Sequence, residues 1–361
     1  VILGASDIHF EPVNQSLRVR FRVTGMLQDV QTFPADKMPQ VIARLKLMAR
    51  LDVTERRQSQ NGRFKFPAEG RVMDLRVATL PLHNGESVVL RLLEFTLSQS
   101  TLTELGFSGE VAAGIESAIS SQQGMILITG PTGSGKTTTL YSLLNRLNQP
   151  HLKLISIEDP VELSIPGINQ IQVDEAHGIT FAEALKSVLR QDPDVIMIGE
   201  IRDEATARLA AQAALTGHLV LSTLHTASAP AAITRLQNLG LPNYLISATL
   251  KSVLAQRLIR CICTECRSQP EEMPATAIDC SNCAGSGYSG RTTIAEFLSL
   301  MDHSIKEKVS ACFNSPHPES MLADHLLNQV TLADDAQRLL GAGLTDDAEI
   351  FRVLGAVAPS Q

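Results

Sequence analysis

The sequence predicts an α/β protein with a mostly parallel sheet, preceded by a smaller α+β domain. Three observations support this fold class. From Phe107 onward, short apolar runs of the buried-strand type alternate with helical stretches. One such run leads directly into the loop 130–137, which fits G-x-x-x-x-G-K-[ST]. The first 95 residues differ, because residues 17–23 alternate apolar side chains with arginines, as a half-buried strand does.

Length and composition bound the possible functions. The 361 residues allow two or three domains, and 44% hydrophobic residues exclude wholesale disorder. A net charge of -7, 4% aromatic residues and no Trp argue against a surface that binds nucleic acid. There is no signal peptide and no apolar run near the roughly 20 residues that cross a bilayer. The chain starts with Val rather than Met, so we expect residues 1–6 to be the end of a longer segment.

The N-terminal domain is expected over residues 1–95. After the strand at 17–23, apolar residues at helical spacing predict a helix over 38–51, with Pro39 tolerated in its first turn. Strands are expected at 72–80 and 88–93, joined by a polar turn at 83–85. A polar stretch over 96–103 opens a linker that we place at 96–106.

The main domain is expected over residues 107–257. Buried strands are predicted at four places and helices at three places between them. The strands are 125–129, 154–158, 195–198 and 218–224, and the helices are 138–147, 181–189 and 204–215. A cysteine module follows at 258–290, and a C-terminal helical region at 291–361, with helices from about Ser304.

The glycine-rich loop predicts a nucleoside triphosphate site. Its glycines let backbone N–H groups turn inward around phosphate oxygens, and the following helix adds its positive N-terminal end. In this pattern Lys136 reaches the β- and γ-phosphates, and the Thr137 hydroxyl ligates Mg²⁺. The predicted nucleotide-binding residues are Gly130, Pro131, Thr132, Gly133, Ser134, Gly135, Lys136, Thr137 and Thr138.

Two buried strands end in carboxylates that could serve this site. One strand ends at Glu158, followed by Asp159 and Pro160, and the other runs from Asp194 to Glu200. Ligands of open α/β sheets bind at the carboxyl ends of the strands, so both tips should converge on the nucleotide. A P-loop also needs an acidic partner on a neighbouring strand for its metal.

Five motifs in a fixed order resemble those of the ATPases of type II secretion and type IV pilus assembly. Residues 5–12 resemble the start of that family's second N-terminal domain, and the P-loop follows. The Asp box at 157–162, the Walker B segment at 190–203 and the His box at 216–226 come next. Gly290, Arg291, Thr292 and Glu296 match the family's G-R-T-x-x-x-E. The resemblance implies a RecA-like core behind a PAS-like N-terminal domain.

The resemblance also implies catalytic roles. Glu158 matches the general base, and Glu200 matches the Walker B carboxylate that acts on Mg²⁺ through water. Which of the two glutamates is the base stays open, because both tips face one site. His225 matches a histidine that senses the γ-phosphate or couples subunits, and His218 at the start of the same strand is a second candidate.

Arginines complete the site that the resemblance implies. Arg76 and Arg91 match the N-terminal arginines that bear on the γ-phosphate, which requires the first domain to close over the P-loop. The alternative is that each arginine lies on the solvent-exposed face of a strand and has no part in the site. Arg190 and Arg202, which flank the Walker B strand, are candidates for the subunit interface.

The cysteines predict a structural zinc site. Cys263 and Cys266, then thirteen residues, then Cys280 and Cys283 form two C-x-x-C pairs, the pattern of a closed four-thiolate site. Alternatives are a redox dithiol or a module that has lost zinc. Cys261 precedes the first ligand, and Cys312 is expected to be a buried thiol.

The resemblance implies a homo-hexamer that uses ATP, Mg²⁺ and Zn²⁺ to power pseudopilus or pilus assembly. It implies a peripheral position at the cytoplasmic face of the inner membrane, with indirect membrane contact. The implied partners are an inner-membrane platform protein and a membrane-anchored assembly partner, with no nucleic acid. Alternatives are the retraction motor of the same superfamily, a nucleic-acid translocase on a RecA-like core, and a non-catalytic scaffold.

Overall fold

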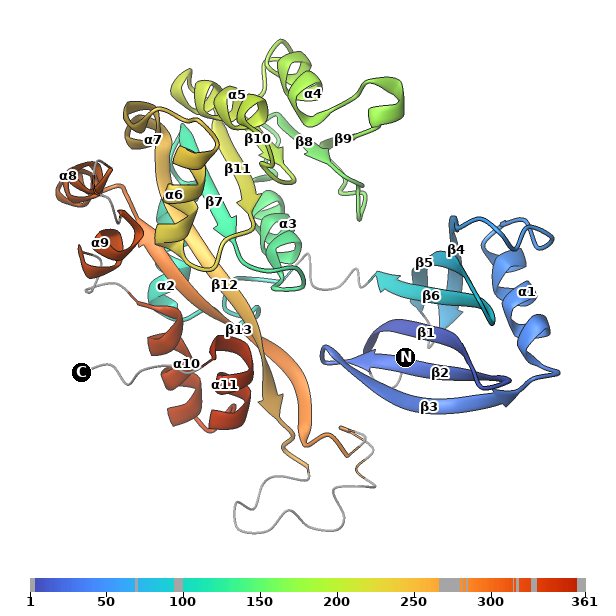
Figure 1. Ribbon diagram of the computed structural model, residues 1–361. Helices are drawn as coiled ribbons and strands as arrows, with labels where there is room; N and C mark the ends of the chain where they lie inside the picture. Colours follow the sequence, from blue (N-terminus) through green and yellow to red (C-terminus); the bar gives the residue numbers. More distant parts are fainter. Residues whose placement is uncertain are drawn as a thin grey trace. The chain divides into compact units, whose positions relative to one another are not determined.

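Two compact units make up the chain in the computed structural model (Figure 1). The first unit comprises Val1–Phe95 with Arg260–Arg291, and the second comprises Thr96–Ile259 with Thr292–Gln361. The structure describes residues 4–68, 71–93, 100–265, 280, 282–283, 285–313, 315, 318–325 and 330–355.

An antiparallel six-stranded sheet and one helix form the first unit. The strand order is β3-β2-β1-β6-β5-β4. The elements are β1 (Ala5–Val13), β2 (Ser16–Val23), β3 (Met26–Pro34), α1 (Met38–Met48), β4 (Gln60–Ala68), β5 (Arg71–Leu82) and β6 (Gly85–Leu93). The predicted strands at 17–23, 72–80 and 88–93 correspond to β2, β5 and β6, whereas β1, β3 and β4 were not predicted.

The alternation in β2 separates a core face from a polar face. Leu17 is fully buried in a cluster that includes Val77 and Val88 of the sheet and Ile42 of α1. On the polar face, Arg20 Nε donates to Glu11 Oε2 on β1 at 2.8 Å. The sheet is therefore amphipathic, with α1 packed on its apolar side.

A seven-stranded sheet forms the second unit, in the order β13-β12-β7-β11-β10-β8-β9. The six strands from β12 to β9 run parallel to their neighbours. The elements up to β11 are α2 (Gly109–Ile119), β7 (Gly124–Thr129), α3 (Lys136–Leu147), β8 (Leu154–Glu158), β9 (Asn169–Gln172), α4 (Phe181–Val188), β10 (Val195–Ile198), α5 (Glu204–Leu215) and β11 (Leu219–Leu224). Those that follow are α6 (Ala229–Asn238), α7 (Asn243–Thr249), β12 (Leu250–Ile262), β13 (Tyr288–Ser299), α8 (His303–Cys312), α9 (Pro318–His325), α10 (Leu332–Gly341) and α11 (Asp347–Leu354).

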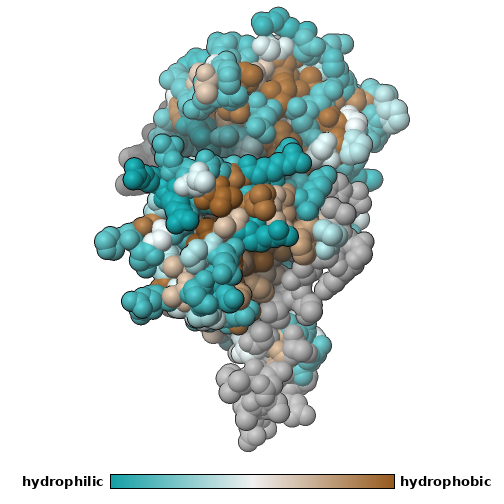
Figure 2. Space-filling model, turned by 90° about the vertical axis from the view of Figure 1, so that its right-hand side faces the viewer, coloured by the Kyte–Doolittle hydropathy of each residue, from teal (hydrophilic) through white to brown (hydrophobic). Residues whose placement is uncertain are grey.

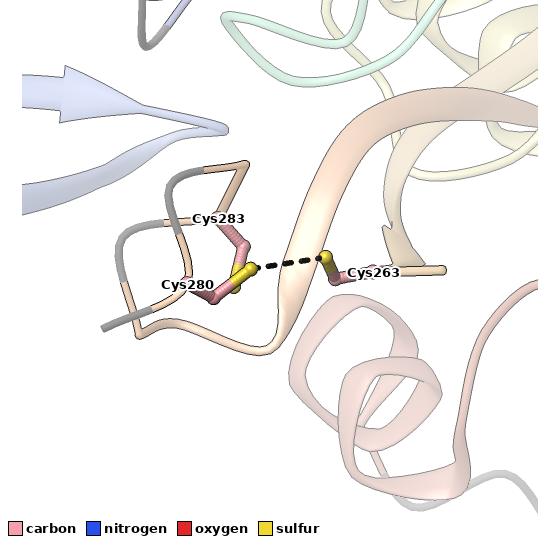
Figure 3. A group of neighbouring side chains, drawn as sticks. All are labelled: Cys263, Cys280 and Cys283. Atoms are coloured by element: carbon pink, nitrogen blue, oxygen red, sulfur yellow. Dashed lines mark hydrogen bonds between the residues drawn. The ribbon is translucent and has the colours of Figure 1, made fainter. Parts of the chain in front are cut away.

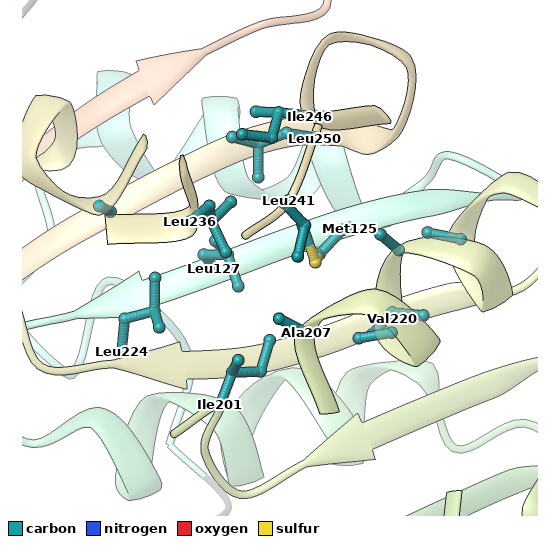
Figure 4. Packing of buried hydrophobic residues seen from close by; sticks show 14 of the residues in the cluster. Met125, Leu127, Ile201, Ala207, Val220, Leu224, Leu236, Leu241, Ile246 and Leu250 are labelled. Atoms are coloured by element: carbon teal, nitrogen blue, oxygen red, sulfur yellow. The ribbon is translucent and has the colours of Figure 1, made fainter. Parts of the chain in front are cut away.

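Helices cover both faces of this sheet, which explains its continuous apolar runs. Met125 and Leu127 of β7 belong to a core cluster with residues of α5, α6 and α7 (Figure 4). Ile126 and Ile128 point to the opposite face and pack in a second cluster with α2 and α3. The predicted RecA-like α/β core is confirmed by this layered arrangement.

Two long strands were not predicted. β12 pairs with β7 in parallel, with Ala255 opposite Thr129, and runs from the end of the predicted main domain to Ile262 in the predicted cysteine module. β13 occupies 288–299, so the beginning of the region predicted to be helical is a strand. The first helix after it begins at His303, close to the predicted Ser304. Polar residues inside β12 hide its strand character from apolar periodicity.

No helix among the described residues is long and apolar enough to span a bilayer. The face shown in Figure 2 carries hydrophobic residues in several groups separated by hydrophilic ones.

Candidate active site

The loop between β7 and α3 has the backbone of a phosphate cradle. Gly130, Gly133 and Gly135 have φ values of 150°, 79° and 90°, which favour glycine. A Cβ on Gly130 would lie 2.5 Å from the Gln256 carbonyl oxygen, so a side chain is excluded there. A Cβ on Gly133 would meet nothing within 4 Å. Gly133 therefore lies on the open side of the loop, where a phosphate can approach.

Polar groups of the loop fit the phosphate and metal that the motif implies. Lys136 Nζ donates to the carbonyl oxygens of Gly130 and Pro131 at 2.7 and 2.9 Å, so the ammonium group is held within the cradle. Burial lowers the pKa of Lys136, and the charge of Glu200 opposes that shift. Ser134 Oγ is buried and has no hydrogen-bond partner among the described residues, while Thr137 is exposed at the first turn of α3. The ammonium group and these two hydroxyls could therefore bind an anion and Mg²⁺.

Glu200 lies beyond the carboxyl end of β10, within electrostatic range of Lys136. Arg202 donates to Glu200 Oε1 at 2.5 Å, and the His225 ring lies 3.3 Å from Oε2. Burial raises the pKa of Glu200, but the hydrogen bond from Arg202 and the charges of Arg202, His225 and Lys136 outweigh it, so the pKa falls below its usual range. Three predicted site residues, Lys136, Glu200 and His225, thus meet at one edge of the sheet.

The two histidines of the His box lie at opposite ends of β11. His225 follows the carboxyl end of the strand, beside Glu200. His218 precedes the amino end, and its Nδ1 lies 2.9 Å from the Ala213 carbonyl oxygen at the end of α5. Within the chain, the length of the strand therefore separates His218 from the edge of the sheet where His225 lies beside Glu200.

Glu158 is more enclosed than the sequence suggested. It is only 4% exposed, although it ends β8 at the same sheet edge. The Tyr141 hydroxyl donates to its Oε2, and Ser156 Oγ and Gln170 Nε2 donate to its Oε1 at 2.6 and 2.9 Å. The Tyr141 oxygen also accepts from the backbone N–H of Glu162 at 3.2 Å. This network ties the tip of β8 to helix α3, which carries Lys136.

Threonine hydroxyls join the ends of the central strands. Thr223 Oγ1 of β11 donates to the Gly199 carbonyl oxygen at 2.7 Å, directly before Glu200. Thr129 Oγ1 at the end of β7 lies 2.7 Å from Thr226 Oγ1 and accepts from the Thr226 N–H at 2.9 Å. The P-loop, the Walker B strand and the His box are therefore connected by hydrogen bonds at the edge where the site residues meet.

The arginines of the first unit form a row across its sheet. Arg76 of β5 lies directly opposite Arg91 of β6, and Arg63 of β4 lies opposite Arg76. Residues directly opposite in an antiparallel pair share one face. Asp7 of β1 is opposite Arg91 and accepts from its Nε at 2.8 Å, while the Arg91 side chain stays 66% exposed.

The other two arginines differ in their surroundings. Arg202 also lies 3.7 Å from Asp159, so it bridges the tips of β10 and β8. Arg190 is exposed just after α4, before the amino end of β10. Of this pair, Arg202 therefore lies near the carboxylates of Asp159 and Glu200, and Arg190 lies elsewhere.

Three of the four predicted zinc ligands come together (Figure 3). The sulfur atoms of Cys263, Cys280 and Cys283 all lie within 4.8 Å of one another, and the Cys263 and Cys280 sulfurs are 3.8 Å apart. Four sulfurs at about 2.3 Å from a tetrahedral zinc ion would be about 3.8 Å apart. Cys266 lies outside the described residues.

The hairpin that carries these cysteines is fixed at its base. The Cys263 N–H donates to the Gly287 carbonyl oxygen at 3.0 Å. The Arg260 guanidinium stacks 3.9 Å from the centre of the Tyr288 ring. Cys261 is half-buried and Cys312 is buried, and burial raises the pKa of both thiols.

Sequence reasoning missed Tyr141, Gln256 and Arg257. Gln256 of β12 is 1% exposed, and its Nε2 donates to the Ser134 carbonyl oxygen at 2.8 Å. Its Oε1 accepts from Thr139 Oγ1 at 3.0 Å, so it joins the P-loop to the first turn of α3. A polar pair in the middle of an apolar strand was the available signal, because buried polar side chains require partners.

Comparisons with known proteins agree with this site. The family described as "Type II/IV secretion system protein" matches residues 1–352. The type II secretion system protein HxcR of Pseudomonas aeruginosa is 44% identical over 349 residues, which cover 97% of this chain and 74% of the relative. The type IV pilus assembly ATPase PilB of Myxococcus xanthus is 45% identical over 325 residues, covering 84% of this chain and 57% of PilB.

A solved structure shares the fold over nearly the whole chain. The pilus retraction motor PilT with bound ADP has a TM-score of 0.68 and 25% identity, covering 99% of this chain and 94% of PilT. The relatives above 40% identity carry the names of secretion and pilus-assembly proteins. On its sequence, its fold and the arrangement of its P-loop, the chain belongs to the type II/IV secretion system ATPase family.

Proposed function

We propose that the chain hydrolyses ATP as a homo-hexamer and uses the energy to assemble a pseudopilus or pilus. The observation that carries this proposal is the meeting of Lys136, Glu200 and His225 beside the P-loop. We place the protein at the cytoplasmic face of the inner membrane, where a platform protein and a membrane-anchored partner would contact it. The names of HxcR and PilB support this assignment.

The residues of the loop bind and orient the triphosphate. Backbone N–H groups of 130–137 and the N-terminus of α3 attract the phosphates, and Lys136 Nζ exchanges its carbonyl partners for β- and γ-phosphate oxygens. Thr137 and Glu200 would hold Mg²⁺, directly or through water, and the ion would neutralise charge on the phosphate oxygens. Glu200 is suited to this role because its pKa is lowered by neighbouring cations.

Glu158 is proposed as the base that orients the attacking water. Its carboxylate lies at the tip of the strand beside β10, and Tyr141, Ser156 and Gln170 fix its position. These three donors leave about one lone pair of the carboxylate free, and the side chain is almost fully buried, so a water molecule must be admitted to this enclosure before Glu158 can accept its proton. The enclosure therefore implies slow hydrolysis until nucleotide and neighbouring subunits reshape the site.

The arginine row supports closure of the first unit over a nucleotide. Arg76 and Arg91 present two guanidinium groups on one face, and a planar guanidinium matches the equatorial oxygens of a transferring phosphoryl group. Asp7 orients Arg91 without enclosing it.

Arg76→Ala and Arg91→Ala should each lower kcat by about tenfold or more, because the transition-state charge loses a cation. Steady-state phosphate release measures this, with zinc content and thermal unfolding as checks on the fold. Arg44→Ala is the matched control, since Arg44 is an exposed arginine on α1 away from the row. A double Arg76→Ala/Arg91→Ala variant with parental kcat would show that the N-terminal domain takes no part in chemistry.

The cysteine hairpin is proposed to hold zinc through Cys263, Cys266, Cys280 and Cys283. A closed four-thiolate site leaves no coordination position for substrate, so the ion would stabilise the hairpin. The redox alternative needs a single C-x-x-C pair in a thioredoxin-like setting, whereas sulfurs from both C-x-x-C pairs lie within 4.8 Å of one another, which favours a metal site.

Purified protein should carry about one zinc ion per chain. Elemental analysis after gel filtration should show the same zinc ratio for Cys261→Ser as for the parent, and a fall for Cys263→Ser. Cys261 is the matched control because it is a half-buried thiol two residues away. Zinc lost from Cys261→Ser but retained by Cys263→Ser would reverse the choice of first ligand.

Gene deletion in the source organism separates the candidate systems. An assembly ATPase predicts loss of secreted enzymes from the medium or of surface pili. A retraction motor, favoured only by the likeness to PilT, predicts pili that accumulate. A translocase predicts DNA-stimulated hydrolysis with an affinity for single strands that falls linearly with log salt, and the net charge of -7 opposes it. Accumulated pili or DNA stimulation would overturn the assembly role.

A further inference from the structure

We propose that Arg257 is a positioning residue that couples the P-loop to the His-box loop, residues 225–228. This inference rests on the proposed ATPase function and names how one part of its site senses another. Arg257 follows Gln256 on β12, and two nitrogen atoms of its guanidinium contact separate segments. One nitrogen, Nη1, donates to the Gln256 carbonyl oxygen at 2.9 Å, and the other, Nη2, donates to the Ala227 carbonyl oxygen at 2.6 Å.

The P-loop side of this contact is tight. The position of a Cβ on Gly130 lies 3.2 Å from Arg257 Nη1 and 2.5 Å from the Gln256 carbonyl oxygen. Gln256 itself holds Ser134 and Thr139 through its side chain. Residues 256 and 257 therefore form one rigid support beneath both ends of the P-loop. A change in the Gly130 turn meets Arg257 directly.

The His-box side is equally constrained. Ala227 lies two residues after His225, and Ser228 caps helix α6 by accepting from the Ala231 N–H at 3.2 Å. The carboxylate of Glu296 on β13 accepts from the Ala229 N–H at 2.6 Å, at the start of the same helix. Glu296 also attracts the Arg257 guanidinium. Arg257 thus lies between a half-buried carboxylate that attracts it and the loop that carries His225.

Nucleotide binding must disturb this arrangement. Lys136 Nζ bonds to the Gly130 and Pro131 carbonyls, and these bonds break when it turns to phosphate oxygens. The Gly130 turn then adjusts against Arg257, which passes the change to Ala227 and so to His225. A lysine at 257 would keep the charge, but a single ammonium group cannot reproduce the planar two-nitrogen contact with two loops.

The test compares Arg257→Lys and Arg257→Gln with the parent as full chains. Arg235→Gln is the matched control, because Arg235 is an exposed arginine in the last turn of α6, the helix that follows the same loop. We measure affinity for a fluorescent ATP analogue, kcat, and hydrogen exchange of residues 225–232 with and without a non-hydrolysable ATP analogue. Both Arg257 variants should bind nucleotide within about threefold of the parent, lose about tenfold in kcat, and lose nucleotide-induced protection at 225–232.

Glu296→Gln provides a second variant in case Arg257 variants fold poorly. It keeps an oxygen for the Ala229 N–H and removes the charge facing Arg257, so protection at 225–232 should weaken with nucleotide affinity retained. Full protection in Arg257→Lys and Glu296→Gln, or equal losses of affinity and kcat, would overturn the coupling. The turnover of the parent distinguishes failure of the coupling from failure of the proposed function. A parent without ATPase activity would refute the proposed function instead of the coupling.

Discussion

Lys136→Ala should abolish ATP turnover and weaken nucleotide binding. The described part of the P-loop offers one ammonium group to the β- and γ-phosphates, and Lys136 Nζ already lies within the cradle. Without it, the phosphate charge is met only by backbone N–H groups and the end of α3, which do not replace a full positive charge. Phosphate release measures turnover, and calorimetric titration with ATP measures affinity.

Lys186→Ala is the control for this variant, since Lys186 is exposed on α4 and forms an ion pair with Glu183 of the same helix. Thermal unfolding belongs in the same experiment, because Lys136 also bonds to two loop carbonyls. Parental turnover in a folded Lys136→Ala protein would remove the P-loop from the catalytic site.

Glu158→Gln should slow hydrolysis by about 10²-fold or more while ATP affinity stays nearly parental, as expected when a base or water-orienting group is lost. The amide keeps the size of the side chain but cannot take the proton. Single-turnover phosphate release and nucleotide titration separate the two effects. Tyr141→Phe is the matched variant, since it removes a donor to Glu158 and leaves the carboxylate in place. We expect a much smaller loss from it.

Glu200→Gln belongs in the same series because the two carboxylates lie on neighbouring strands. Glu200 lies beside Lys136 and His225 and is the carboxylate proposed to hold Mg²⁺. Removal of its charge should therefore raise the Mg²⁺ concentration needed for half-maximal activity. Glu158→Gln activity within threefold of the parent, with a large loss in Glu200→Gln, would transfer the role of base to Glu200.

Strands buried on both faces were predicted almost residue by residue. The structure places β8 and β10 at the predicted bounds, because both are short apolar runs between turns. Helix α3 begins at Lys136, two residues before the predicted start, because the P-loop itself forms the entry to the helix. The P-loop motif and its flanking elements were therefore enough to predict the core of the fold.

Strands with mixed side chains were not predicted. β3 and β4 contain polar and charged residues among the apolar ones, and their pairing partners, rather than their periodicity, make them strands. β12 is similar, because Gln256 and Arg257 interrupt its apolar pattern. Whether such a segment forms a strand depends on pairing partners that are distant in the chain, and a single sequence does not reveal those partners.

The candidate site also has features that the sequence predicts and features that depend on partners distant in the chain. Lys136, Glu200 and His225 could be placed together because the carboxyl ends of parallel strands share one edge. The enclosure of Glu158 depends on Tyr141 and Gln170, whose hydrogen bonds no motif records. The separation of His218 from His225 follows from the length of β11, which lies between them, and could have been foreseen from the rise per residue of an extended strand.

Phosphate release as a function of protein concentration tests the central claim most directly. One core domain supplies Lys136, Thr137, Glu158 and Glu200, whereas Arg76 and Arg91 come from a separate unit. If a ring brings these groups together, Mg²⁺-dependent activity per chain should rise with concentration, in step with the hexamer fraction measured by mass photometry. Activity per chain that stays constant while monomers become hexamers would contradict a site completed by assembly.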